Sequence, residues 1–454
     1  MFYEKISLSR LKKLIMKKHS ALLTAVAVIL FAIAIGVSSN AQTPTARYLL
    51  SLSDVDMVGT AYIDGNLGPP VEQLDTLSVF DLSGSNSEAV GQVNASNSVF
   101  SPPLVMDVTP DGLALIVETL QPRSQEATML DQLVPGNTLR AFDISDPTQP
   151  SLVDEAAIGE RPAAIAVNPG GDLALAVGRS LANGLMFYPI EQNGIGEMKQ
   201  IPLPIPPRPD LTNETVTSVQ WHPSGRYVAV NLPLRNQVVF IEVVRDEGGE
   251  VTEARLWGNP VTTNKFPLLG RFTPDGKFYI TSDLLWGQDT LNYFFTNQGF
   301  LSSIQLAEVG STGDNARHSL TGAVSGGLNS ETIAISPDGR YLVASRMGTT
   351  GYLKNHPEYN PQASLGFYEI NPTDGRLQLL SEHEYEAMLP QGLAFDPSGE
   401  FIYVGVSQYE NDTNNSLLGA VEVWNLQTGD NPTLERTQKT FRAPRGVHTL
   451  SIIQ

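Results

Sequence analysis

One short pattern of apolar and polar positions recurs six times along the chain. In each copy an apolar run leads into a turn of the Pro-x-Gly type, and a second apolar run follows. The copies are LVMDVTPDGLALIV, AAIAVNPGGDLALAV, VTSVQWHPSGRYVAV, LLGRFTPDGKFYIT, TIAISPDGRYLVAS and GLAFDPSGEFIYVG, with turn prolines Pro110, Pro169, Pro223, Pro274, Pro337 and Pro397. Proline presets φ for the first turn position, and glycine tolerates the positive φ at which the chain reverses. Each copy is therefore predicted to be a β-hairpin.

A further apolar run, predicted to be the third strand of each unit, recurs seven times along the chain. The seven runs cover residues 76–83, 138–145, 184–190, 238–244, 300–306, 364–370 and 420–426. The turn prolines lie 51 to 63 residues apart, which is too long for one hairpin and fits a four-stranded propeller blade whose fourth strand is weaker. No segment between the runs has a sustained helical period of 3.6 residues, so the chain is predicted to be all-β.

Seven third strands with only six hairpins leave one unit divided between the two ends of the chain. Residues 444–452 resemble a first strand without its turn, and residues 47–52 resemble a second strand without its first. Pairing them completes a seventh blade with the C-terminal strand innermost and removes open sheet edges. We therefore expect one seven-bladed β-propeller domain over residues 42–454, with no separate second domain.

Units such as TIAISPDGRYLVASRMG, followed by SLGFYEINPTDGRLQLL, resemble the YVTN or lactonase-type seven-bladed propellers. This is the family around bacterial 6-phosphogluconolactonase. The resemblance implies the propeller fold and a lactonase-like activity. The family often carries Pro-Arg-His ahead of the innermost strand, where this chain has Ser330-Glu331-Thr332 and only a displaced partial version at Arg445 and His448.

Residues 1–41 have the pattern of a secretory leader. Lys12, Lys13, Lys17 and Lys18 precede an uncharged apolar run from Ala21 to Val37, and Ser39-Asn40-Ala41 offers small residues for cleavage. The run of 17 residues lies near the lower limit for spanning a bilayer, so a retained anchor stays open. Either alternative predicts an exported protein, periplasmic or extracellular.

Charge and cysteine content narrow the partners. The chain has no cysteine, and residues 42–454 carry 23 basic and 47 acidic residues, a net charge of −24. Such a surface repels phosphate backbones and anionic lipid, so we expect neither nucleic-acid binding nor membrane contact beyond the N-terminal anchor left open above. The expected partner is a small molecule, a glycan or a protein, and the expected state is a monomer.

The loops are predicted to divide unequally between the two faces of the propeller. The turns between first and second strands are short, which makes one face plain. The long excursions at 53–75, 120–137, 283–299, 307–329 and 346–363 are assigned to the other, loop-rich face. Long loops gathered on one rim favour a functional site there, although insertions tolerated at a solvent rim are the structural alternative.

Charged residues just after the second strands are candidates for this site. They are Glu118, Arg179, Arg235, Asp283, Arg346 and Glu410, and each is expected to point toward the mouth of the central channel. The predicted ligand-binding residues are Arg179, Arg235, Asp283, Arg346 and Arg445. Arginine binds carboxylates and stabilises oxyanions, whereas a rim arginine paired with an acidic residue is the structural alternative.

Two histidines are candidates for acid–base chemistry. His318 lies in one of the long excursions and His448 on the predicted innermost C-terminal strand, whereas His222 occupies a turn and is expected to be structural. If the protein is a lactonase, the predicted catalytic residues are His318, His448 and Arg346. That hypothesis requires at least one of these two histidines to lie within hydrogen-bonding distance of a guanidinium, directly or through one water, in a single cleft.

We expect no cofactor and no metal. The chain lacks phosphate loops, zinc-binding helices and haem attachment sites. Asp54 and Asp56 resemble the start of a calcium loop, but its glycine and glutamate are missing, and Asn411–Thr413 is a weak cation candidate. The function predicted first is an exported propeller that binds a ligand through its loop-rich face, and the alternatives are a lactonase-like hydrolase and an envelope scaffold.

Overall fold

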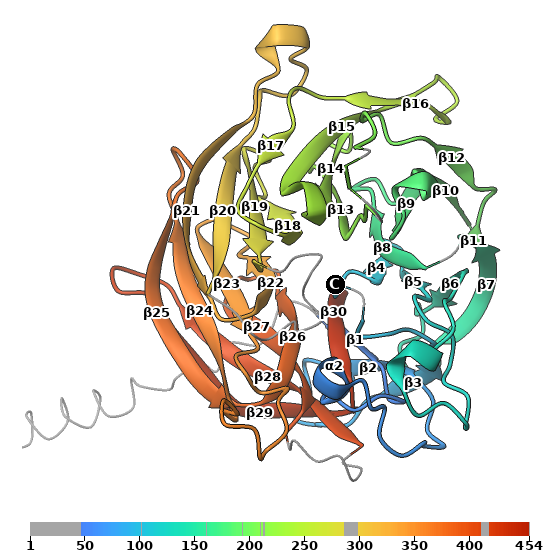
Figure 1. Cartoon of the computed structure of the whole chain (residues 1–454), viewed down its shortest axis with the longest axis vertical. Coiled ribbons are helices and arrows are strands. Elements are labelled where there is room, and N and C mark those ends of the chain that lie inside the picture. Colours follow the sequence, from blue (N-terminus) through green and yellow to red (C-terminus); the bar gives the residue numbers. More distant parts are fainter. Residues whose placement is uncertain are drawn as a thin grey trace, which may run out of the picture. The chain divides into compact units, whose positions relative to one another are not determined.

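Seven small β-sheets are arranged in a ring around a central axis (Figure 1). They are seen in a computed structural model, which describes residues 47–453 apart from 101, 160, 193, 209, 212–213, 286–297 and 410–416. The predicted leader at 1–41, Glu410 and Asn411–Thr413 lie outside the described residues. In the described part of the chain, no helix has the length and apolar character needed to cross a membrane.

Each sheet is an antiparallel blade, and its successive strands lie farther and farther from the central axis. The innermost strands are β4 (Met106–Val108), β8 (Pro162–Val167), β13 (Ser218–Trp221), β18 (Pro267–Phe272), β22 (Ser330–Ile335), β26 (Met388–Phe395) and β30 (Val447–Ile453). The second strands are β1 (Tyr48–Ser53), β5 (Leu113–Val117), β9 (Leu173–Gly178), β14 (Tyr227–Leu232), β19 (Phe278–Asp283), β23 (Tyr341–Arg346) and β27 (Phe401–Gln408).

The third strands coincide with the seven apolar runs of the sequence. They are β2 (Thr76–Asp81), β6 (Thr138–Asp143), β10 (Leu185–Glu191), β15 (Gln237–Arg245), β20 (Gly299–Gln305), β24 (Gln362–Ile370) and β28 (Leu418–Gln427). The outer strands are β3 (Gly91–Asn94), β7 (Ser151–Ala157), β11 (Gly194–Ile195) with β12 (Lys199–Ile201), β16 (Val251–Leu256) with β17 (Val261–Thr262), β21 (Ser319–Gly327), β25 (Leu377–Glu386) and β29 (Thr433–Pro444). The predicted all-β propeller with seven blades is confirmed.

The ring closes as expected from the two ends of the chain. β30 pairs antiparallel with β1, from Tyr48 opposite Ile453 to Leu52 opposite Thr449, and is the innermost strand of that blade. Each innermost strand contacts the next around the axis, and β30 contacts both β26 and β4. The blade built from both termini therefore leaves no gap in the ring.

The second strands form the centre of each blade's packing. Every residue of β5, β9, β14, β19 and β23 is buried, because neighbouring blades cover both faces of these strands. This explains why they appear in the sequence as continuous apolar runs rather than as an alternating pattern.

The turn glycines are required by both backbone and packing. Gly171 has φ +75°, and a Cβ there would lie 2.7 Å from Cδ of Pro110, the turn proline of the preceding blade. The other five turn glycines also have positive φ. Each turn is thus held against its neighbour, which keeps this face plain.

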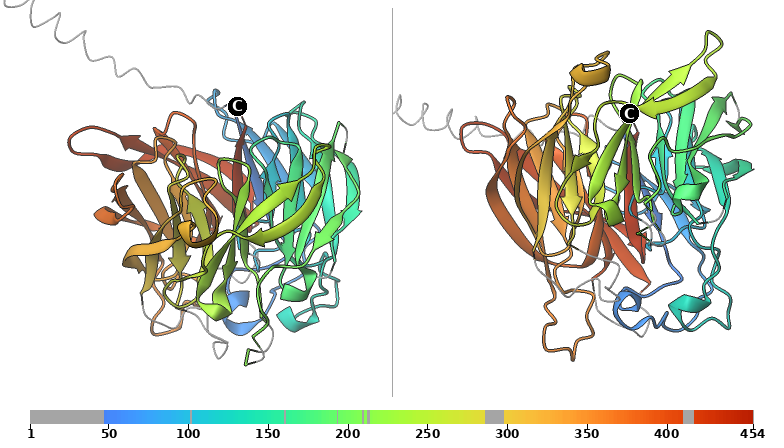
Figure 2. Two further views of the ribbon diagram at one scale, coloured as in Figure 1. Left: turned by 90° about the horizontal axis from the view of Figure 1, so that it is seen from above. Right: turned by 45° about the horizontal axis from the view of Figure 1, so that its top comes forward.

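Short helices mark the opposite face. They are α2 (Ala61–Asp64) and the 3₁₀ turns η1 (Leu130–Gln132), η2 (Leu181–Asn183) and η3 (Pro233–Arg235), which follow second strands or lie in their connections. In the left view of Figure 2 this loop-rich face lies at the bottom, away from the C-terminal end of β30.

One predicted excursion lies elsewhere. Residues 307–329 are predicted on the loop-rich face, but they contain η4 (Gly313–Asn315) and the outer strand β21. Because β20 runs toward the plain face, the connection from β20 to β21 belongs there. The sequence of β21, SLTGAVSGG, is rich in small residues and therefore has the pattern of a loop.

Candidate functional site

The innermost strands are distorted where they meet the loop-rich face. In β8, β18, β22, β26 and β30 the pairing with the second strand shifts near that end. Such bulges displace residues and redirect their side chains. The displaced segments contain Glu331 in β22, Gln391 in β26 and His448 in β30, which are polar side chains from three successive blades.

Glu331 is the titratable group of this region. It is 5% exposed, and its Oε2 accepts a hydrogen bond of 2.8 Å from Nε2 of Gln391. Burial raises the pKa of Glu331 to about 7, against a smaller opposing effect of the Gln391 bond. A carboxyl group with this pKa is partly ionised at neutral pH and can both accept and return a proton.

Residues 54–75, here called the cap loop, bring Tyr62 to the amide of Gln391 that also binds this carboxyl. Tyr62 lies on α2, accepts from Nε2 of Gln391 at 3.3 Å and donates to the carbonyl of Val99. Its ring lies 4.7 Å from the ring of Phe100. The amide of Gly59 donates to Oε1 of Gln408 at 2.9 Å, so the cap loop reaches from the first blade to the last.

Arg179, from another blade, contacts Phe100. It follows β9, is half-buried, and its Nη2 donates to the carbonyl of Phe100. We call Tyr62, Phe100, Arg179, Glu331 and Gln391 the mouth cluster. Arg179 is thus a predicted ligand-binding residue that the fold brings to this cluster.

Three polar atoms beside Glu331 lack partners. Oε1 of Gln391, Oγ of Ser330 and Oγ1 of Thr332 are buried without a hydrogen bond in the described part of the chain. A buried polar atom without a partner is costly, so such atoms mark places where water or a ligand would be bound.

His448 lies on the innermost strand as expected, but both of its ring nitrogens have partners. Nε2 lies 2.5 Å from Oδ1 of Asn97, and Nδ1 lies 3.0 Å from Oγ1 of Thr449. Burial lowers the pKa of His448 to about 3, so the ring is neutral at physiological pH. Arg445 is also buried, and its Nε donates to the carbonyl of Val55 at 3.1 Å.

Arg346 does not point toward the channel mouth as predicted. Its Nη1 forms an ion pair of 2.5 Å with Glu382 on the outer strand β25, and its Nη2 donates to Oη of Tyr368 at 2.6 Å. The guanidinium therefore extends outward along the blade. Glu382 follows Arg346 by 36 residues, so the sequence pattern offered no sign of this pairing.

The other charged candidates are also held by neighbours within the fold. Arg235 forms an ion pair with Glu214 and donates to the carbonyl of Pro206 at 2.9 Å. Asp283 accepts from Ser302 at 2.5 Å, and burial raises its pKa to about 6. Glu118 forms an ion pair of 2.9 Å with Arg140. These side chains were expected at the channel mouth, but they bind their own blades and connections.

His318 was expected on the loop-rich face and lies on the plain one. It precedes β21, and its Nε2 lies 2.6 Å from the carbonyl of Trp257. Gly327, at the other end of β21, lies against Arg346. The intervening eight residues of strand span about 26 Å, so His318 and Arg346 cannot act on one substrate.

The structure shows no direct contact of the kind that histidine-based catalysis would use within the described part of the chain. Among the described residues, the hydrogen-bond partners of His318 and His448 include no guanidinium. His222 lies in its turn as expected, with Nδ1 2.8 Å from Oγ of Ser224 and Nε2 2.9 Å from the carbonyl of Gly276.

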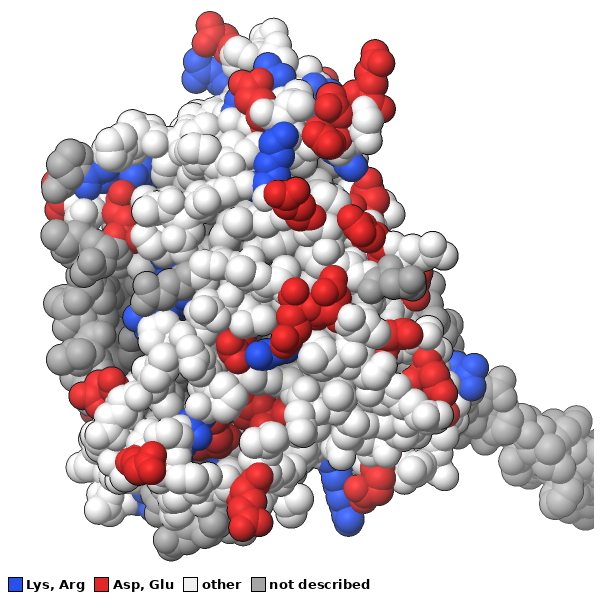
Figure 3. All heavy atoms as spheres, turned by 90° about the vertical axis from the view of Figure 1, so that its right-hand side faces the viewer, with Lys and Arg blue, Asp and Glu red and all other residues white. Residues whose placement is uncertain are grey.

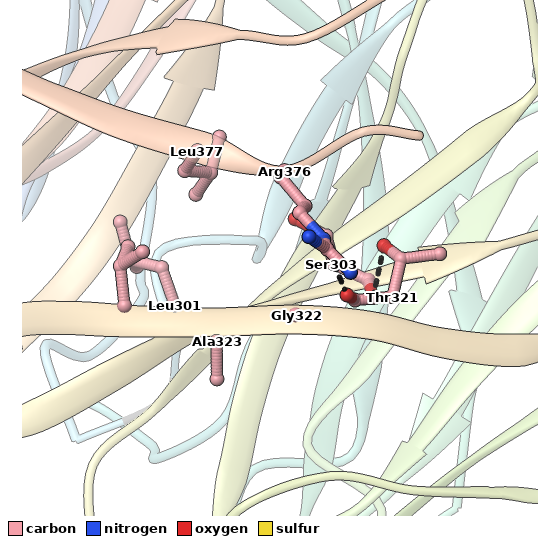
Figure 4. Close-up of a pocket in the computed structure, with 8 residues that line it drawn as sticks. Leu301, Ser303, Thr321, Gly322, Ala323, Arg376 and Leu377 are labelled. Atoms are coloured by element: carbon pink, nitrogen blue, oxygen red, sulfur yellow. Dashed lines mark hydrogen bonds between the residues drawn. The ribbon is translucent and has the colours of Figure 1, made fainter. Parts of the chain in front are cut away.

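A groove of about 360 Å³ lies away from the mouth cluster (Figure 4). It is lined by residues of β20, β21 and the start of β25. Arg376 crosses it and donates to the carbonyl of Thr321 at 2.9 Å, while Leu301 and Leu377 lie at its other end. Its described lining contains no acid or histidine, so it has no group for proton transfer.

The fold and the mouth cluster define a seven-bladed β-propeller with a buried polar centre at one face. Residues 311–447 match the family model described as "Lactonase, 7-bladed beta-propeller". This match covers less than a third of the chain, so it shows that the segment is similar to lactonase-type propellers, in agreement with the resemblance found in the sequence.

Individual known proteins are similar to this chain either in the sequence of a short segment or in the fold of nearly the whole chain. A 6-phosphogluconolactonase of Formosa agariphila is 32% identical over 83 residues, which are 18% of this chain and 20% of the relative. The chain therefore matches about a fifth of that curated relative's length. The periplasmic gluconolactonase of Pseudomonas aeruginosa has a TM-score of 0.60 at 14% identity, covering 89% of this chain and 99% of that one. A functionally unknown protein from Desulfotomaculum acetoxidans gives 0.57 at 12% identity, covering 90% and 99%. At such identities the likeness concerns the fold.

Proposed function

We propose that the protein is an exported lactonase-like hydrolase that opens a sugar or organic-acid lactone at the mouth cluster. The observation that carries the proposal is Glu331, a buried carboxyl with a pKa near 7 at the channel end of an innermost strand. A matching family model and a curated relative named 6-phosphogluconolactonase support this reaction class. Export rests on the basic and apolar pattern of residues 1–41.

In the proposed reaction Glu331 acts as the general base. Its carboxylate takes a proton from water while the water oxygen bonds to the carbonyl carbon of the lactone. The ring C–O bond then breaks, and Glu331 returns the proton to the leaving alcohol oxygen. The product is an open-chain hydroxy acid, and no other reactant is needed.

The neighbours of Glu331 have separate roles in this scheme. Arg179 supplies positive charge for the carbonyl oxygen as it becomes anionic. Gln391 keeps the Glu331 carboxyl in place, and its 3.3 Å bond to Tyr62 is long enough to be exchanged for a bond to the substrate. Ser330 and Thr332 offer unpartnered hydroxyl groups to the hydroxyls of a sugar ring.

The charge of the protein favours an uncharged substrate. Residues 42–454 have a net charge of −24. Acidic side chains are spread over the side that bears β7 and β11, with fewer basic ones among them (Figure 3). Because an acidic surface repels phosphate, we propose a neutral lactone rather than a phosphorylated one.

The test is hydrolysis of neutral sugar lactones and aliphatic lactones by the purified protein, its Glu331→Gln variant and a Glu197→Gln control. Glu197 is exposed and lies outside the mouth cluster. We expect Glu331→Gln to lower kcat/KM by at least about a hundredfold, because a general base contributes about 10²–10⁴. Wild-type activity should rise about tenfold per pH unit below pH 7, as Glu331 ionises. Equal turnover by all three proteins would contradict the role of Glu331.

The second candidate function is ligand binding without turnover. The sequence alone placed this function ahead of hydrolysis. Two observations support it: the predicted histidines are not joined to Arg346, and Glu331 is only 5% exposed. In that case the mouth cluster would bind a small molecule, a glycan or a protein through the loop-rich face. A screen that finds a bound ligand and no hydrolysis would support it over the enzyme.

A further inference from the structure

Three carboxylates meet at the base of the cap loop. Asp54 begins this loop, Asp75 ends it, and Asp56 lies near its start. One carboxylate oxygen from each lies within 4.8 Å of the others. Asp54 and Asp75 are buried, whereas Asp56 is half-buried.

The hydrogen bonds that these acids accept come from backbone amides. Oδ2 of Asp54 accepts from Val99 at 2.9 Å, and Asp75 accepts from Val55 at 2.8 Å and from Asn97 at 3.1 Å. Oδ2 of Asp56 accepts from the amide of Arg123 at 2.9 Å. These bonds hold the carboxylates in place but bring no opposite charge to them.

Oδ1 of Asp54 supplies an independent sign that a ligand belongs here. This atom is buried, has no hydrogen-bond partner in the described part of the chain, and belongs to a residue that is 1% exposed. A carboxylate oxygen left without water, donor or cation is strongly unfavourable. Burial and the neighbouring carboxylates of Asp56 and Asp75 raise the pKa of Asp54 well above its usual range.

Two arginines are near, yet neither pairs with these acids. Arg445 attracts all three acids electrostatically and Arg123 attracts Asp56, but both guanidiniums donate to backbone carbonyls. Among the ion pairs of the described residues, none includes Asp54, Asp56 or Asp75. A bound cation would relieve the remaining negative charge.

We propose that Asp54, Asp56 and Asp75 bind one calcium ion. Calcium takes six to eight oxygen ligands at about 2.3–2.6 Å in flexible geometry, and carboxylates and backbone carbonyls both serve as ligands. Magnesium demands near-ideal octahedral geometry and usually keeps several of its waters, so a largely buried set of carboxylates favours calcium. The three acids fall outside any short calcium-loop motif because Asp75 follows Asp56 by 19 residues.

The proposed ion would fasten the cap loop. Asp54 and Asp75 join the two ends of this loop, and their amide partners Val99 and Asn97 precede Phe100 of the mouth cluster. Calcium would therefore hold α2 and Tyr62 in place beside Gln391, the hydrogen-bond partner of Glu331. This inference does not depend on the proposed hydrolysis, because binding is measured without any substrate.

The experiment is calorimetric titration of the chelator-treated protein with calcium chloride, alongside thermal unfolding with and without calcium. We expect one ion per chain. The unfolding midpoint should rise by about 3 °C at a calcium concentration about a hundredfold above Kd. Magnesium should give a smaller rise at the same concentration.

Variants identify the ligands. Asp75→Asn should abolish the calcium response, and Asp56→Asn, at a half-buried position, provides the same test if the first variant does not fold. Asp131→Asn is the control, because Asp131 is exposed and lies in η1 of the same face. Absence of binding by the wild type, or unchanged binding in Asp56→Asn and Asp75→Asn, would overturn the proposal.

Discussion

At the scale of single residues, Glu331 combines a benefit for the proposed catalysis with a cost for stability. Its side chain is buried without a cation, and its pKa of about 7 lies above the ordinary 4.5. Groups whose environment opposes ionisation are typical of functional sites, where a fold keeps an unfavourable residue for its chemistry. The same shift makes the stability of the protein depend on pH.

Glu331→Gln should therefore stabilise the protein in alkaline solution. The folded state holds the Glu331 proton up to about pH 7, whereas the unfolded chain loses it near 4.5, so stability falls as pH rises between these values. Above pH 7 the penalty amounts to about 3 kcal/mol. Denaturant unfolding should show a gain of that order for Glu331→Gln at pH 8 and little change at pH 4. Equal effects at both pH values would contradict burial of an ionisable group.

The residue chemistry was only partly predictable. Gln391 and Glu331 both stand six residues before a turn proline, so their shared position was visible in the sequence. The contact of Gln391 with Tyr62 was not, because it joins residues 329 positions apart. Arg346 was interpreted from its place after a strand, but its partner Glu382 lies on an outer strand that only the folded blade brings near.

At the scale of elements, the hairpins were predictable because their turn chemistry is local. Proline, glycine and the flanking apolar runs lie within about fifteen residues, and all six hairpins formed. Outer strands such as β21 were less clear, since one face is solvated and small residues replace the apolar alternation. This difference led to the wrong face for His318.

Two glycines with positive φ, one in a hairpin turn and one in the connection from β20 to β21, allow backbone and packing effects on stability to be separated. Gly171 has φ +75° and lies against Pro110, whereas Gly310 has φ +90° and open space within 4 Å of where a Cβ would stand. Alanine at Gly310 should cost about 1 kcal/mol from the backbone alone, and alanine at Gly171 about 3 kcal/mol because the clash adds to it. Chemical denaturation of both variants checks the difference. Equal losses would mean that the contact between turns contributes nothing.

At the scale of the whole molecule, closure joins the two ends of a chain of more than four hundred residues. β30 brings Val447, His448 and Thr449 into the interior, and these three are at most 2% exposed. His448 also ties this strand to Asn97, in the connection between the first two blades. Closure was predictable from counting strands, whereas the polar tie through His448 was not.

Removal of residues 447–454 should open the ring. Without β30, strand β1 loses its inner partner, and the contacts with β26 and β4 are lost as well. The exposed strand edge favours aggregation. We expect the unfolding midpoint to fall by more than about 10 °C, because many buried contacts are lost together.

Removal of Gln454 alone is the control and should leave the midpoint unchanged. A peptide of residues 446–454 added to the shortened chain should restore part of the loss, since the vacant strand position remains available. An unchanged midpoint in the shortened chain would show that the ring holds without the seventh blade's innermost strand.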